Sequence, residues 1–170
     1  MKICIVGGGS AGWMSATTFS RCLDCEITVV ESPNVPTSGV GESTLFEIQD
    51  WMNLVGIDRD ELVRKTNGTY KHSIKFTNWL KKDSGSFHYP FGEHPNFSPE
   101  RWWEFHTKNE DKVSPNDYGT MLNVVGTIAE KGKFDELSPY AYHFDAVKFA
   151  NLLKDGLEGA VEYISGDVVD

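Results

Sequence analysis

The chain has 170 residues, of which 39% are hydrophobic and 24% charged, as in an ordinary soluble globular domain with one sizeable core. Sixteen basic against 25 acidic residues give a formal net charge of −9, which argues against nucleic acid or an anionic membrane surface as a partner. No apolar run approaches the roughly 20 residues of a membrane span, and three cysteines without a framework spacing agree with a reducing compartment, so we expect a cytoplasmic protein.

The first 31 residues predict one compact βαβ unit. A short apolar run at residues 3–6 leads directly into the glycine-rich segment 7–12, and helical spacing follows to about residue 22. Residues 26–31 then predict a second strand. Strand, glycine turn and helix in this order are the setting in which a Gly-x-Gly-x-x-Gly sequence binds a dinucleotide, so we prefer that interpretation to a purely structural turn.

The residues of this turn have separate predicted tasks. Gly7 permits the tight turn, Gly9 lets backbone N–H groups approach a pyrophosphate, and Gly12 allows close helix–strand packing. Ser10 and Ala11 begin the helix, whose N-terminus faces the anion. Glu31 lies 19 residues after Gly12, close to the roughly 20-residue offset of a carboxylate that accepts a hydrogen bond from a ribose hydroxyl. FAD and NAD share this pattern.

A second glycine-bearing loop follows two prolines, and its candidate residues are Gly39, Val40, Gly41, Glu42 and Ser43. It either lies against a flavin ring or is a simple connection, and the residues alone favour neither interpretation.

Two helices are predicted next. Thr44 and Glu47 have the spacing of a capping box and predict a helix that ends at Gly56, and the box formed by Asp58 and Glu61 predicts a shorter one. Asn67-Gly68 is a turn signal before the next strand.

Residues 70–79 alternate and predict a single half-buried strand. Lys75 points away from the face that carries Ile74 and Phe76, and on physical grounds alone it is a solvated lysine. Tyr89 and Phe91 are either two core aromatics or a platform for an arene, with even weight. No common metal-ligand spacing occurs, so no metal site is predicted.

The remaining chain completes an α/β fold. Residues 93–139 predict loops with short helices, Asp145 predicts the cap of a helix reaching Gly156, and residues 161–164 and 168–169 predict strands that return to the nucleotide sheet. We therefore assign residues 1–80 and 140–170 to a nucleotide-binding core and residues 81–139 to a loop-rich insertion on the substrate side.

Five segments together resemble the flavin-dependent tryptophan halogenase family, in its order and at its spacing. They are residues 7–14 (GGGSAGWM), 39–43 (GVGES), 67–68 (NG), 74–79 (IKFTNW) and 143–146 (HFDA). The resemblance implies a Rossmann-type FAD-binding domain of the glutathione-reductase/hydroxylase-like flavoprotein fold. It spans the whole chain but only the N-terminal part of a family member, so residues 1–170 would be a single FAD-binding region at the start of a longer halogenase. The family's catalytic glutamate and halide-binding segment lie outside it.

The resemblance also implies a function and its participants. A separate flavin reductase would supply FADH2, and dioxygen and a halide ion would be the co-substrates that give hypohalous acid. Lys75 would be the catalytic residue that delivers the halogen to tryptophan or another electron-rich arene of the indole or phenol type. Tyr89 and Phe91 match the region that holds the indole, with Tyr89 where a histidine is often found, and the backbone of Val168 would contact adenine.

Two alternatives stay open. One is a different FAD-dependent monooxygenase on the same fold, such as an aromatic hydroxylase, in which Lys75 is an ordinary surface charge. The other is a non-catalytic FAD-binding module, if the chain is complete. The sequence leaves the halide, the arene carbon and the oligomeric state open, a homo-oligomer included.

Overall fold

The computed structural model describes residues 1–37, 39, 41–91, 99–109, 112, 131–134 and 139–169. The chain divides into two compact units, which we call the core unit (residues 1–69 and 142–170) and the hairpin unit (residues 70–141). Residues 70–80, predicted as part of the nucleotide-binding core, cluster with the hairpin unit. None of the helices in the described part of the chain has the length and apolarity to cross a bilayer.

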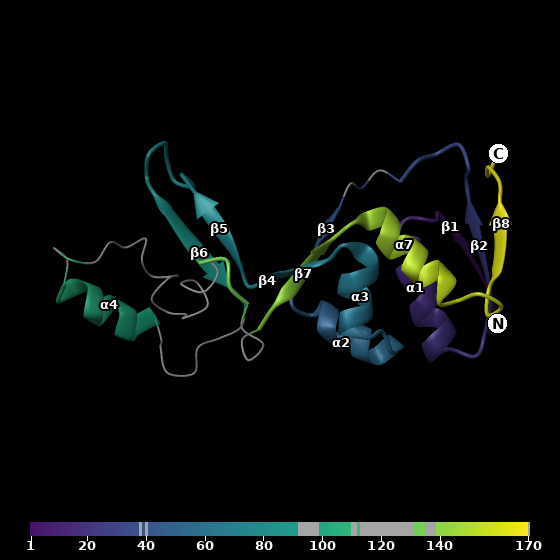
Figure 1. Cartoon of the computed structure of the whole chain (residues 1–170), viewed down its shortest axis with the longest axis horizontal. Coiled ribbons are helices and arrows are strands. Elements are labelled where there is room, and N and C mark those ends of the chain that lie inside the picture. Colours follow the sequence, from purple (N-terminus) through teal and green to yellow (C-terminus); the bar gives the residue numbers. More distant parts are fainter. Residues whose placement is uncertain are drawn as a thin grey trace. The chain divides into compact units, whose positions relative to one another are not determined.

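The core unit is built on a parallel sheet of three strands, β1 (Lys2–Val6), β2 (Glu26–Glu31) and β8 (Glu162–Ser165), in the order β1-β2-β8. Helix α1 (Ser10–Cys22) connects β1 to β2, and α7 (Ala146–Asp155) packs on α1 at the same side of the sheet (Figure 1). Ile27 and Val29 of β2 are buried. The predicted βαβ unit is therefore confirmed, whereas residues 168–169, predicted as a strand, are not one.

Local signals set the ends of three helices, as predicted at Gly56, Asp58 and Asp145, and Asn67, predicted as a turn, is also the end of a helix. Gly56 adopts the left-handed conformation (φ 74°) that closes α2 (Ile48–Val55), and Asn67 (φ 53°) closes α3 (Arg59–Thr66) in the same way. The Asp58 carboxylate accepts a hydrogen bond from the Glu61 N–H at 2.8 Å, and the Asp145 carboxylate accepts one from the Lys148 N–H at 2.9 Å. Each of these caps depends only on residues within one turn.

The capping box predicted at Thr44 is wrong. Thr44 follows the short strand β3 (Glu42–Ser43), which pairs with β7 (Ala141–Phe144), and its N–H donates to the Tyr142 carbonyl at 3.0 Å. The Thr44 hydroxyl also accepts a hydrogen bond from the Tyr142 N–H at 3.0 Å. Because both groups of Thr44 are used by this pairing, α2 begins later, at Ile48, without a side-chain cap.

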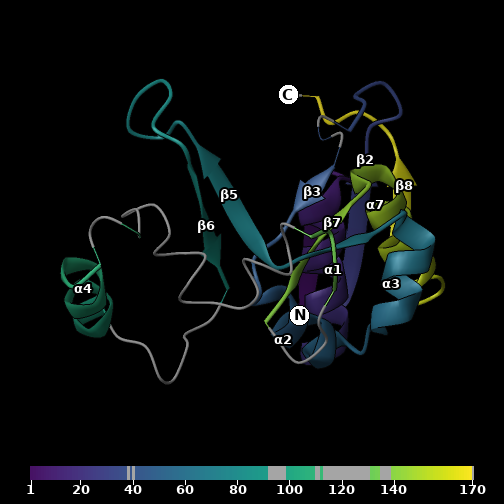
Figure 2. The ribbon, with the colours of Figure 1, turned by 60° about the vertical axis from the view of Figure 1, so that its left-hand side comes forward.

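The hairpin unit contains the antiparallel pair β5 (Ser73–Thr77) and β6 (Ser86–Pro90), and helix α4 (Pro99–Thr107) lies further along its chain (Figure 2). The strand predicted over residues 70–79 is broken at His72, between β4 (Thr69–Lys71) and β5. The His72 carbonyl accepts a hydrogen bond from the Phe91 N–H at 3.2 Å. The predicted alternation survives only in β5, where Ile74 and Phe76 are half-buried and Lys75 is exposed.

Lys71 is a buried charge in the hairpin unit, and its burial lowers the pKa of the ammonium below the usual 10.5. Its Nζ lies 5.1 Å from the centre of the Phe91 ring. Between the lowered pKa and 10.5 the unfolded chain binds more protons than the folded one, so raising the pH favours the folded state. We expect the free energy of unfolding of the wild type to rise relative to that of Lys71→Met between pH 7 and 10, measured by chemical denaturation. If the difference in free energy of unfolding between the two proteins stays constant over this pH range, burial of the Lys71 charge does not destabilise the fold.

Candidate functional site

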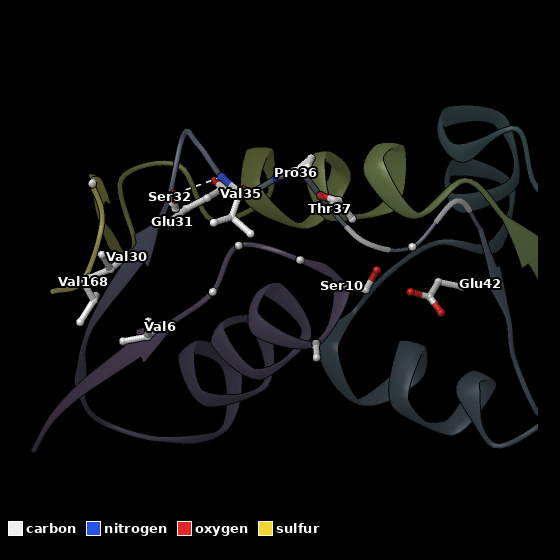
Figure 3. Close-up of a pocket in the computed structure, with 16 residues that line it drawn as sticks. Val6, Ser10, Val30, Glu31, Ser32, Val35, Pro36, Thr37, Glu42 and Val168 are labelled. Atoms are coloured by element: carbon white, nitrogen blue, oxygen red, sulfur yellow. Dashed lines mark hydrogen bonds between the residues drawn. The ribbon is translucent and has the colours of Figure 1, made fainter. Parts of the chain in front are cut away.

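A pocket of about 500 Å³ opens at the carboxyl ends of β1 and β2 in the core unit (Figure 3). The glycine turn after β1, the loop after β2 and the residues after β8 line it. It gathers eight of the residues predicted to bind a cofactor: Gly7, Gly9, Ser10, Ala11, Glu31, Gly39, Glu42 and Val168. This is the edge of a parallel sheet at which ligands of open α/β folds bind.

The other predicted residues lie elsewhere. Gly12 packs beneath the turn, and Gly41 and Ser43 line a neighbouring hollow of about 470 Å³ together with Glu42 and His143. Val40 lies outside the described residues. The pocket also includes residues that the sequence analysis did not single out, among them Gly8, Ser32 and Gly166.

The glycines of the turn differ in what a side chain would meet. A Cβ at Gly12 would collide with the backbone carbonyl oxygen of Gly7, whereas a Cβ at Gly9 would meet nothing within 4 Å. Gly7 has φ 121°, a conformation that favours glycine, and its N–H donates to the Val30 carbonyl at 2.8 Å. Gly12 is thus required by packing, and Gly9 leaves open space at the wall of the pocket.

The N-terminus of α1 offers unused hydrogen-bond donors to this pocket. The first N–H groups of a helix have no partner within it, and the N-cap residue Gly9 supplies no side chain to bind them. The first turn of α1 carries no acidic residue. The Ser10 hydroxyl oxygen is buried without a hydrogen-bond partner in the described chain, and it points into the pocket, as does the Glu42 carboxylate (Figure 3). These donors and the positive end of the helix dipole fit the pyrophosphate of a dinucleotide such as FAD.

Glu31 stands at the carboxyl end of β2, directly over Gly8. A Cβ at Gly8 would collide with the Glu31 side chain, so a buried glycine is needed for the carboxylate to lie there. The carboxylate reaches the ammonium of Lys154 at 3.4 Å. Gly8 could have been found from the sequence, because it is the middle one of three consecutive glycines. No sequence pattern pointed to Lys154 as a neighbour of the pocket.

A hydrogen-bonded clasp joins the loop after β2 to the chain after β8. The Asp167 carboxylate accepts hydrogen bonds from the Ser32 hydroxyl and from the Asn34 amide, the latter at 2.7 Å. These bonds, first that of Ser32, lower the pKa of the exposed Asp167 carboxyl below its usual value. The Ser32 oxygen also accepts from the Val35 N–H at 3.1 Å (Figure 3). The clasp holds together the end of the pocket at which Val168 lies.

The hairpin unit places Lys75 and Tyr89 on opposite faces of the β5–β6 pair. Lys75 is opposite His88 and Ile74 is opposite Tyr89, and successive side chains on a strand point to opposite sides. His88 is buried, and its Nδ1 lies 2.7 Å from the Ser73 oxygen. Lys75 therefore shares its face with a histidine and a serine.

Tyr89 and Phe91 differ in accessibility. Tyr89 is 63% exposed, whereas Phe91 is 7% exposed and has the Lys71 ammonium 5.1 Å from its ring centre. Of this predicted aromatic pair, only Tyr89 therefore presents a free ring surface. In the described part of the chain, no three His, Cys, Asp or Glu side chains gather to hold a metal ion.

Comparisons of sequence and of structure with known proteins each give halogenases as proteins similar to this chain. The family model described as "Tryptophan halogenase" matches residues 2–170. Tryptophan 7-halogenase RebH of Lentzea aerocolonigenes is 33% identical over 90% of this chain, and 7-chloro-L-tryptophan 6-halogenase KtzR of Kutzneria sp. (strain 744) is 34% identical over 98%. The structure of Xcc4156, a flavin-dependent halogenase from Xanthomonas campestris, superposes with a TM-score of 0.84 at 30% identity over 99% of this chain.

These alignments cover only part of each relative. The chain spans 33% of RebH, 38% of KtzR and 36% of the Xcc4156 structure. The likeness to the Xcc4156 structure confirms the predicted α/β, Rossmann-type flavoprotein fold.

Proposed function

Because the chain belongs to the tryptophan halogenase family, whose members use FADH2, a halide and dioxygen, we propose that it forms the FAD-binding part of a flavin-dependent halogenase. The observation that carries this proposal is the pocket at the N-terminus of α1, where the glycine turn, the Ser10 hydroxyl and the Glu31 carboxylate meet.

The residues of the pocket fit the parts of FAD. The N–H groups at the start of α1 and the Ser10 hydroxyl would donate to the pyrophosphate, and the Glu31 carboxylate would accept from the ribose hydroxyls. The residues after β8, with the exposed Val168, would lie beside adenine. The bound flavin would supply the activation of dioxygen, and this chain's residues bind and orient it.

Lys75 is proposed as the residue that directs the halogen. Its side chain is exposed on β5, and an ammonium offers three hydrogen-bond donors. It would either hydrogen-bond hypohalous acid as the ammonium or, after losing a proton to water, attack the halogen as the neutral amine. In the second case an N–halogen bond forms, the O–halogen bond breaks, and the departing hydroxide takes an N–H proton and leaves as water. In both cases the lysine would hold the electrophilic halogen beside one arene carbon. A reagent held in this way attacks that carbon in preference to other sites. Free hypohalous acid would oxidise indiscriminately.

The substrate we propose is an electron-rich arene of the indole or phenol type, with FADH2 supplied by a separate flavin reductase. The relatives RebH and KtzR are named as acting on tryptophan and 7-chloro-L-tryptophan. The exposed Tyr89 ring offers a face on which an arene can stack. Tyr89 lies on the face of the β5–β6 pair opposite to that of Lys75. An arene held beside Lys75 would therefore contact Tyr89 only by extending past an edge of this pair of strands.

The assay that tests this function uses the full-length protein with a flavin reductase, NADH, FAD, air and one halide at a time. A panel of indoles and phenols is supplied, and products are read by mass spectrometry. We expect products in which one hydrogen is replaced by halogen, only when halide is present. The same mixture without the protein controls for chemistry in solution. Catalase removes the hydrogen peroxide that free reduced flavin forms with dioxygen. Products that gain oxygen alone would indicate a hydroxylase.

A further inference from the structure

Beside the residues that line the pocket, three side chains from three elements surround the ammonium group of Lys154. Lys154 extends from the last turn of α7, and its Nζ lies 3.4 Å from the Glu31 carboxylate at the end of β2. The same Nζ is 3.5 Å from the centre of the Tyr163 ring on β8 and 5.6 Å from that of Trp13 on α1. The two rings stack with centres 6.1 Å apart. The ammonium therefore has a fixed place.

This arrangement is partly shielded from water. Trp13 is 1% exposed and the side chains of Lys154 and Glu31 are 34% and 28% exposed, whereas Tyr163 is 42% exposed. An ion pair in such a setting is screened less than one on the surface, and an ammonium against two aromatic faces gains cation–π attraction. The exposed pair of Lys2 and Glu26 on the same sheet, with side chains 83% and 76% exposed, lacks these features.

Glu31 is held from two sides. The Lys154 ammonium approaches its Oε2, and Gly8 lies against its Oε1 and Cδ. Glu31 and Gly8 line the pocket, whereas Lys154 does not. A carboxylate has about four lone-pair sites on its two oxygens, so the ion pair at Oε2 leaves lone pairs of Glu31 for further hydrogen bonds. A bidentate contact with two neighbouring hydroxyls requires such an oriented carboxylate.

We propose that Lys154 is a positioning residue that orients the Glu31 carboxylate toward the two hydroxyls of the adenosine ribose, and so makes the pocket prefer ribonucleotides to dideoxyribonucleotides. Lys154 acts only through Glu31 and does not touch the nucleotide. The proposal rests on the binding of FAD in this pocket, but not on the halogenation reaction.

The test uses the full-length protein stripped of flavin, with ADP and 2′,3′-dideoxy-ADP as probes and affinity measured by calorimetry. The wild type should prefer ADP by about 10-fold or more, because hydrogen bonds to a charged group are the stronger kind. Lys154→Met should lose most of that preference while its affinity for dideoxy-ADP stays within about twofold of the wild type. Lys154→Arg should restore it, since the charge returns to the same place.

Two further variants separate positioning from structure. Lys148→Met removes an exposed lysine from the same helix and should keep the wild-type preference. In a Glu31→Gln background, Lys154→Met should change the preference no further. A Lys154→Met protein that keeps the full preference, or weakens both probes in equal proportion, would overturn the proposal, as would a wild type that does not discriminate. If the wild-type protein does not bind FAD at all, the proposed function itself would be refuted.

Discussion

Lys75→Ala in the full-length protein is expected to lower halogenated product by at least about 100-fold, the lower range for loss of a positioned catalytic group. FAD affinity should not change, because Lys75 is not among the residues that line the pocket. Lys75 is exposed, so removing its side chain should alter the free energy of unfolding by no more than about 0.5 kcal/mol. Product is measured by mass spectrometry and FAD binding by equilibrium dialysis.

Two control variants sharpen this result. Lys82→Ala removes an exposed lysine from the chain between β5 and β6 and should leave the product yield unchanged. Lys75→Arg keeps a cation that donates hydrogen bonds but is not a nucleophilic amine at neutral pH, so it distinguishes the two roles considered for Lys75. Substantial product from Lys75→Arg favours the hydrogen bond, and none favours the haloamine. Undiminished product from Lys75→Ala would remove Lys75 from the mechanism.

Gly12→Ala and Gly9→Leu should separate folding from cofactor binding. A Cβ at Gly12 would collide with the backbone oxygen of Gly7, which has no rotamer to adopt, so we expect a loss of about 1–3 kcal/mol in the free energy of unfolding, with weaker FAD binding as a consequence. Gly9 has an extended conformation that other residues adopt, and its Cβ meets open space. Gly9→Leu should therefore change stability by less than about 1 kcal/mol.

Because the space at Gly9 is the pocket itself, the leucine side chain should occupy the volume needed by the pyrophosphate and lower FAD affinity by about 100-fold or more. Denaturation in urea gives the stability of both variants, and flavin fluorescence gives the affinity. Gly9→Ala is the matched control for the loss of glycine alone. Retention of FAD by Gly9→Leu would contradict the placement of the pyrophosphate at this turn.

The sequence by itself determined the elements whose signals lie within one helical turn or one strand. The βαβ unit with Glu31 at its end, the caps at Asp58 and Asp145, and the left-handed ends at Gly56 and Asn67 were all predictable, because each depends on neighbouring residues. The glycine spacing also predicted the part of the pocket that the turn and the start of α1 form, since these two segments are contiguous in the chain.

Only the tertiary structure decided features that join distant residues. Thr44 has the local pattern of a helix cap, but its groups are bound by Tyr142, 98 positions away. The pairing register of β5 and β6 put Lys75 beside His88, and a slip by one residue would have put it beside Tyr89. The contact of Lys154 with Glu31 spans 123 positions. Such contacts arise when separate elements pack together, and their free energy depends on that packing rather than on any local preference, so no pattern along the chain encodes them.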